Sequence, residues 1–149
     1  MTKPATSIEA IATSCIAGRL RLLNRVVTNL YDDALRPFGV RLSQGNVLAV
    51  TAKLGVARPA EVCDILELDT STLSRTVDRM VENGWLEIVP DEDGRSQPFR
   101  LTAEGRRLME RALPAWEQAQ AGARKLLSDD GLRLLDAAIG RVKAAHAGA

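Results

Sequence analysis

The stretch that decides the fold is DTSTLSRTVDRMVENGWL, residues 69–86. Asp69 is a residue type that caps the free amides at a helix start, and Gly84 readily adopts the left-handed conformation that ends a helix. Between them the apolar side chains recur at the spacing of one helix face: Leu73, Val77 and Met80. The stretch therefore predicts an amphipathic helix from Asp69 to Asn83 that buries one face.

The opposite face of this helix suits the major groove of DNA. Its first exposed turn is small and hydroxylated, while the carboxylates of Asp78 and Glu82 come later. A helix that enters the groove leads with its N-terminal end, so donors must come first and carboxylates must stay away from phosphates. Arg75 can bind a guanine edge through two hydrogen bonds. The alternative is a polar face that is merely solvated.

Two shorter helices are predicted ahead of this one. Residues 43–54 have Ser43 as a cap and Gly55 as a stop. Residues 59–66 carry Pro59 at the first helical position, where its missing N–H costs nothing. Three consecutive helices joined by tight turns indicate a helix-turn-helix with one preceding helix.

A hairpin, the wing, is predicted after the third helix. Two β-prone runs, residues 86–89 and 97–101, enclose the turn residues Asp93-Gly94. Arg95 follows the turn directly and can reach the narrow minor groove, whose potential attracts arginine. An acidic neighbour can orient it through an ion pair, the candidates being Asp91 and Asp93. The alternative is a solvent-exposed turn that happens to carry charges.

Amphipathic helices are predicted at both ends of the chain. The first runs from about residue 8 to residue 35 and is ended by Pro37. The last segment holds a helix over residues 102–127, bent at Pro114, and a second helix that opens after Ser128-Asp129-Asp130, with Ser128 or Asp129 as its cap. Each end carries an apolar stripe that one thin lobe cannot cover, so we expect a partner chain to cover it. The alternative is packing within one chain.

The composition excludes several classes of protein. The 149 residues include 20 Lys and Arg against 19 Asp and Glu, so any charged surface must be local. One histidine, His146, and two cysteines, Cys15 and Cys63, supply neither a metal site nor a Ser-His-Asp triad, so we expect no enzyme, no metal and no cofactor. No targeting segment or membrane span is visible, and we expect a cytoplasmic protein without a membrane partner.

Four motifs together resemble the MarR (multiple antibiotic resistance regulator) family. They are LRPFGVRLSQ at residues 35–44, the helix at residues 68–86, DEDGRS at residues 91–96 and LTAEG at residues 101–105. Each motif is weak alone, but their order and spacing are specific. The resemblance covers the chain from about Ser14 to Leu127.

The resemblance implies a mainly α fold with a small β-hairpin wing: a winged helix-turn-helix with N- and C-terminal dimerisation helices. It divides the chain into an N-terminal dimerisation helix (1–36), a DNA-binding lobe (37–103) and C-terminal dimerisation helices (104–149). It implies a homodimeric repressor on a pseudo-palindromic operator of double-stranded DNA. The expected DNA-binding residues are Ser43, Ser71, Thr72, Ser74, Arg75, Arg79 and Arg95.

The resemblance also suggests how binding is switched. Family members are commonly released from DNA by small phenolic or lipophilic ligands bound between the dimer and DNA lobes, or by cysteine oxidation. We expect such an effector, with Trp116 and Phe38 as candidates for lining its cavity. One alternative is a redox-sensing repressor switched at Cys15, one helical turn before Arg19, whose charge favours the thiolate. Another is a winged-helix module that contacts proteins without binding DNA.

The expected lobe is less basic than a DNA-binding surface usually is. Residues 70–107 hold six Arg against seven acids, a net charge of −1. Because counterion release favours basic surfaces, binding has to rely on a few well-placed arginines and on amides at helix N-termini. Further basic residues lie nearby in the sequence: Arg36, Arg41, Lys53 and Arg58.

Overall fold

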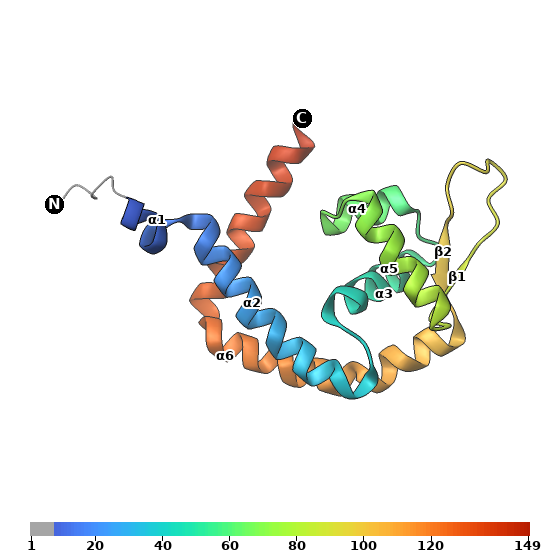
Figure 1. Ribbon diagram of the computed structural model, residues 1–149, viewed down its shortest axis with the longest axis horizontal. Helices are drawn as coiled ribbons and strands as arrows, with labels where there is room; N and C mark the ends of the chain where they lie inside the picture. Colours follow the sequence, from blue (N-terminus) through green and yellow to red (C-terminus); the bar gives the residue numbers. More distant parts are fainter. Residues whose placement is uncertain (1–7) are drawn as a thin grey trace. The chain divides into compact units, whose positions relative to one another are not determined.

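A computed structural model describes residues 8–149 (Figure 1). The chain forms two compact units: one is Asp32–Glu117, and the other combines the chain up to Tyr31 with Gln118–Ala149. Two long helices, α2 (Ile16–Leu35) and α6 (Ala103–Ala147), run through both units. The mainly helical fold with one hairpin confirms the expected fold class.

The Asp32–Glu117 unit has the predicted order of elements. After the end of α2 come the 3-10 helix η1 (Arg36–Phe38), α3 (Leu42–Leu54), α4 (Pro59–Leu66), α5 (Thr70–Glu82), β1 (Leu86–Ile88) and β2 (Phe99–Leu101). In Figure 1 the three helices gather beside the hairpin, and the loop that joins the strands extends away from them. Each strand is one or two residues shorter than predicted.

The apolar face of α5 lies in the core of this unit, as its pattern predicts. Its buried residues are Leu73, Val77 and Met80, and the other elements contribute Val47, Leu48, Val62, Leu86 and Phe99. Asp69 caps the helix, accepting a hydrogen bond from the backbone N–H of Thr72 at 2.8 Å. Gly84 follows the helix with a φ of 78°, the left-handed conformation that glycine adopts without strain.

The hairpin is antiparallel, and a third segment extends it. Leu86 pairs with Leu101 and Ile88 with Phe99. On its other side Phe99 exchanges two backbone hydrogen bonds with Ala57, at 2.8 and 3.0 Å. The chain that leads into α4 is therefore fixed to the base of the wing.

The start of α3 differs from the prediction, because Ser43 is not its cap. The N-cap is Arg41, and Ser43 lies within the first turn. Two other side chains satisfy the free amides: Asp32 accepts the N–H of Leu42 at 2.7 Å, and Gln44 accepts the N–H of Arg41 at 3.0 Å. With these acceptors in place, the Ser43 hydroxyl is not needed as a cap.

The N-terminal helix is interrupted at Cys15, where one continuous helix was predicted. It consists of α1 (Ile8–Ser14) and α2. Thr13 and Ser14 both donate their hydroxyls to the carbonyl of Ala10, at 3.4 and 2.5 Å. Hydroxyls that bond back to the preceding turn compete with the backbone ladder and bend helices, which accounts for the break.

Near the C-terminus, α6 is interrupted at Ser128, as predicted. Ser128 has a φ of 61° and a ψ of 166°, and its hydroxyl accepts the N–H of Gly131 at 3.3 Å, which caps the following helix. Ser128 is the residue within α6 with non-helical angles, so Pro114 does not break the helix. In the same unit Tyr31 donates its hydroxyl to Gln120, and burial raises the pKa of the phenol.

The unit formed by the two ends of the chain leaves many large apolar side chains exposed. They are Ile8, Ile11, Ile16, Leu20, Leu22, Leu23, Val26, Leu30, Leu126, Leu134, Leu135, Ile139 and Val142. Among the described helices, none combines the length and the apolar character needed to cross a lipid bilayer.

Candidate nucleic-acid interface

A polar groove of about 330 Å³ runs between the start of α3 and the exposed face of α5. We call it the arginine groove, and its lining residues are Arg41, Ser43, Gln44, Thr72, Arg75, Thr76 and Arg79. Four of the seven predicted DNA-binding residues therefore share one surface: Ser43, Thr72, Arg75 and Arg79. Arg41, which sequence reasoning treated only as a nearby charge, joins them because it is the N-cap of α3.

The arginine groove has three cations and no acidic side chain in its lining. Within residues 8–149, Arg41, Arg75 and Arg79 form no ion pair with any carboxylate. Guanidinium groups without protein partners are available for phosphates and base edges, which they bind through paired hydrogen bonds.

The first turn of α5 is organised by Asp69. Its carboxylate accepts the hydroxyls of Ser71 and Thr72, each at 2.7 Å, in addition to the Thr72 amide. The hydroxyl bond from Thr72, then that from Ser71, then the Thr72 amide hold the pKa of Asp69 well below its usual range. With their protons directed to Asp69, these two hydroxyls present lone pairs outward. Ser74, one turn further on, is exposed.

The wing loop places the predicted orienting carboxylate differently from expectation. Asp91 accepts the Ser96 hydroxyl at 2.9 Å and pairs with Arg58 at 3.3 Å, so its partner is Arg58 and not Arg95. The bond from Ser96, followed by Arg58, lowers the pKa of Asp91 despite partial desolvation. Asp93 contributes its backbone N–H to Asp91, and its side chain is exposed. Asp91 and Asp93 thus shape the loop, and among the described residues neither forms an ion pair with Arg95.

Arg95 is exposed on the wing and lies next to the second half of the α5 surface. It lines a depression of about 350 Å³ together with Ser74 and Asp78 of α5 and Ser96 of the wing. No ion pair of Arg95 occurs in the part of the chain that the structure describes. The exposed face of α5 and the wing arginine therefore form one continuous surface.

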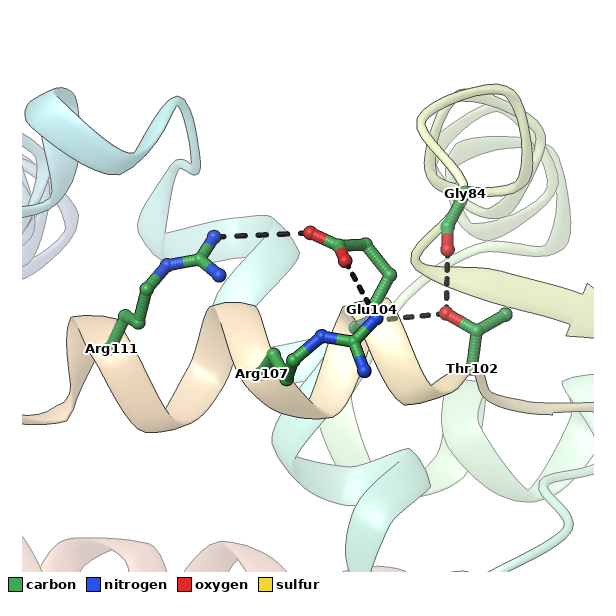
Figure 2. Close-up of polar contacts among 6 residues, drawn as sticks. Gly84, Thr102, Glu104, Arg107 and Arg111 are labelled. Atoms are coloured by element: carbon green, nitrogen blue, oxygen red, sulfur yellow. Dashed lines mark hydrogen bonds and ion pairs between the residues drawn. The ribbon is translucent and has the colours of Figure 1, made fainter.

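Three of the seven acids in residues 70–107 pair with arginines that lie outside the arginine groove. Glu87 pairs with Arg100 across the hairpin at 2.6 Å. At the start of α6, Glu104 contacts Arg107 at 3.0 Å and Arg111 at 3.9 Å (Figure 2). Together with Asp91, these carboxylates are paired with arginines outside the arginine groove. The net charge of −1 over residues 70–107 therefore does not describe the arginine groove, whose lining holds three arginines and no acid.

Hydrogen bonds of Thr102 connect the end of α5 to the start of α6. Thr102 donates its hydroxyl to the carbonyl of Gly84 at 2.5 Å and accepts the N–H of Gly105 at 3.0 Å (Figure 2). The backbone N–H of Thr102 donates to Trp85 at 3.1 Å. These bonds fix the hairpin between the end of α5 and the start of α6, so the base of the wing is held in place.

An apolar cavity of about 290 Å³ lies within the same unit. Its lining residues are Leu35, Val40, Leu42, Gly45, Asn46, Ala49, Met109, Ala112, Leu113 and Trp116. Trp116 lines a cavity as expected, but Phe38 is not among the lining residues. None of the ten is charged, so the cavity suits an uncharged apolar ligand.

Cys15 lies at the helix break and is half-buried with a free thiol. The Arg19 guanidinium donates to the carbonyl of Thr13 at 2.9 Å. It is therefore engaged with the backbone, and the structure adds no observation that favours Cys15 as a redox switch.

Three helices, a two-stranded wing and an arginine-lined exposed helix face define a winged helix-turn-helix protein. The model of the MarR family matches residues 38–96. The chain is therefore similar to the MarR family over the part that holds α3, α4, α5 and the wing loop.

Individual relatives agree with this similarity. The HTH-type transcriptional regulator YwoH of Bacillus subtilis is 31% identical over 86 residues, which cover 58% of this chain and 63% of YwoH. The multiple antibiotic resistance protein MarR of Salmonella typhimurium is 28% identical over 117 residues, covering 76% of this chain and 81% of MarR. The chain thus spans less than two thirds of YwoH.

Solved structures show the same fold. A cysteine-to-serine mutant of E. coli MarR, complexed with operator DNA, superposes with a TM-score of 0.80 at 22% identity, covering 91% of this chain and 99% of that one. The transcriptional regulator MOSR of M. tuberculosis, in complex with DNA, gives a TM-score of 0.77 at 28% identity, covering 89% and 98%.

Proposed function

We propose that the chain is a homodimeric, cytoplasmic transcriptional repressor that binds a pseudo-palindromic DNA operator and is released by a small lipophilic or phenolic ligand. Similarity to the MarR family supports the regulatory role, and two proteins of the same fold were crystallised with DNA. The observation that carries the proposal is the arginine groove: its lining holds Arg41, Arg75 and Arg79 and no carboxylate, and within residues 8–149 none of the three forms an ion pair.

In this proposal α5 enters the major groove with its N-terminal half. Arg75 reads a guanine edge, and Ser71, Thr72 and Ser74 meet bases or phosphates beside it. Arg79 and Ser43 line the same groove and bind the phosphate backbone of the DNA. Because Asp69 takes the protons of two of these hydroxyls, they act as acceptors, for which the amino groups of adenine and cytosine are the matching donors.

The wing supplies a second contact in the adjoining minor groove. The loop that carries Arg95 extends from the helices of the unit (Figure 1), and within residues 8–149 Arg95 forms no ion pair that binding would have to displace. A narrow minor groove has an enhanced negative potential, into which arginine inserts favourably.

The test is a mobility-shift titration with the DNA that flanks the gene. We expect salt-dependent binding, and we expect Arg75→Ala to cost about 1–3 kcal/mol and to relax specificity at one base position. Arg95→Ala weakens binding as well. Arg100→Ala is the matched control, because it removes the same charge from a residue that pairs with Glu87 outside the interface. Absence of salt-dependent binding would favour a module for protein contacts only.

The apolar cavity supports the effector part of the proposal. It is bounded by the end of α2, by α3 and by α6 within Asp32–Glu117, so an occupant touches the helix that precedes the helix-turn-helix. Burying a charge without a partner is costly, and no lining residue supplies one. The preferred ligand is therefore a neutral aromatic molecule with little polarity.

A pair of probes tests this preference. We expect 4-chlorophenol, neutral at pH 7, to change the fluorescence of Trp116 and to release DNA, and 4-chlorobenzoate to act at least about tenfold more weakly. Ala49→Leu fills the cavity and abolishes the response, whereas Ala52→Leu, on the same helix but outside the lining, keeps it. Equal responses to both probes, or an unchanged response in Ala49→Leu, would contradict the effector site.

A further inference from the structure

The wing loop is fastened to the start of α4 by a three-residue cluster. The Ser96 hydroxyl donates to Asp91 at 2.9 Å, which closes the loop on itself. One guanidinium nitrogen of Arg58 reaches both, at 3.3 Å from the Asp91 carboxylate and 3.0 Å from the Ser96 hydroxyl oxygen. Asp91 keeps only 14% of its side chain exposed, whereas Arg58 keeps 57%.

The backbone of Arg58 is fixed on both sides. Ala57 exchanges two hydrogen bonds with Phe99 of the hairpin, and Pro59 begins α4 directly after Arg58. Because its backbone is fixed in this way, the Arg58 side chain can hold Asp91 and Ser96 close to the rest of the lobe. Arg58 therefore connects the loop of the wing to the helix-turn-helix.

The loop has few other internal bonds. The backbone bonds are Val89 to Pro98 at its base, at 2.8 Å, and Gly94 to Asp91 at its turn, at 3.2 Å. Ser96 is the residue next to Arg95, so the hold of Arg58 on Ser96 acts one residue away from the exposed wing arginine. Without Arg58 the loop keeps its internal bonds but loses this attachment to the start of α4.

We infer that Arg58 is a positioning residue for DNA binding: it holds Asp91 and Ser96 so that Arg95 is pre-oriented for the minor groove, and it does not itself bind the DNA. The inference rests on the proposed function. Pre-orientation raises affinity because a mobile side chain loses conformational freedom when it binds. Because the Arg58 side chain is 57% exposed, solvent screens its attraction to Asp91, so we expect the effect of Arg58 on binding and not on folding.

Simple electrostatics predicts the opposite sign for one variant. Asp91→Asn removes a negative charge from the lobe, so attraction to phosphates alone would tighten binding. The cluster predicts weaker binding, since the amide no longer attracts Arg58. Glu92→Gln is the matched control, because it removes the same charge from an exposed neighbour that has no ion pair in residues 8–149. We expect Glu92→Gln to bind as tightly as the wild type or more tightly.

The decisive experiment is a double-mutant cycle in the full chain, measured by fluorescence anisotropy with the operator duplex at three salt concentrations. We expect Arg58→Ala to weaken binding about three- to tenfold and to have no further effect on affinity or salt slope in the Arg95→Ala background. Thermal unfolding of each variant checks that the lobe stays folded.

The outcomes distinguish a positioning role of Arg58 from direct binding of Arg58 to the DNA. Additive losses, with the salt slope reduced by about a further 0.9, would show that Arg58 binds a phosphate directly and would overturn the inference alone. Tighter binding by Asp91→Asn would also overturn it. Absence of DNA binding by the wild-type chain would overturn both the inference and the proposed function.

Discussion

At position 105 any side chain would collide with the backbone of Trp85. A Cβ atom built there lies 2.2 Å from the Trp85 carbonyl oxygen and 3.1 Å from a methyl carbon of Leu101. Gly105 is also buried, and its N–H is bonded to Thr102. The first turn of α6 can therefore approach the start of the hairpin only because this residue is glycine.

Gly105→Ala should destabilise the protein despite the better helix propensity of alanine. Because the obstacle is backbone, the helix start must move, and we expect a loss of about 1–3 kcal/mol in the free energy of unfolding. Gly122→Ala, in the same helix but with open space around the new methyl group, should raise stability by up to about 1 kcal/mol. Urea unfolding of both variants measures the difference, and equal stabilities would contradict the steric argument.

At the scale of helices and strands, the features that could be predicted are those that depend on nearby residues. The pattern of residues 69–86 predicted α5 with its cap, its buried face and its glycine stop, because all three depend on neighbours within one or two turns. The Asp93-Gly94 turn follows the same logic, and Gly94 has a φ of 62°. Local chemistry was therefore sufficient to predict α5 and the turn of the wing.

Long-range partners could not be predicted in the same way. Ser43 was a reasonable cap for α3, but Asp32 and Gln44 already satisfy the first amides. Asp91 pairs with Arg58, a residue 33 positions away. The site prediction likewise missed the place of Arg41, because only the packing of α3 against α5 brings it beside Arg75.

The cap of α5 should make stability depend on acid pH. The pKa of Asp69 is depressed in the folded chain, so its contribution is complete above its ordinary value of 3.8 and is lost as pH falls below it. Asp69→Ser keeps a cap acceptor that does not titrate. We expect the variant to be less stable than the wild type at pH 7 and the gap to narrow between pH 4 and pH 2. Urea midpoints across this range measure it, and a constant gap would exclude the carboxylate as the cause.

At the scale of the whole molecule, the exposed apolar side chains are unevenly divided between the two units. Most of its large exposed apolar side chains belong to the unit formed by the two chain ends, where Leu134 is 72% and Ile8 is 84% exposed. Apolar surface on this scale usually marks an interface. This is the structural support for a second copy of the chain as the partner of that unit.

Leu134→Asp should therefore weaken dimerisation. A carboxylate placed in an apolar interface costs desolvation energy in both copies, and we expect the mass in solution to fall from two chains toward one. Val56→Asp is the control, because it alters an exposed apolar residue in the other unit. Sedimentation equilibrium reports the result. A wild-type chain that is already monomeric would remove dimerisation from the proposed function.

Both boundaries between the two units fall inside helices, since Tyr31 and Asp32 belong to α2 and Glu117 and Gln118 belong to α6. The lobe consequently has no linker at which it can be excised. A fragment of residues 32–117 would begin inside α2 and end inside α6. The backbone N–H groups of its first turn and the carbonyl groups of its last turn would then lack their helical partners. Limited proteolysis should accordingly spare the two boundaries at residues 31–32 and 117–118.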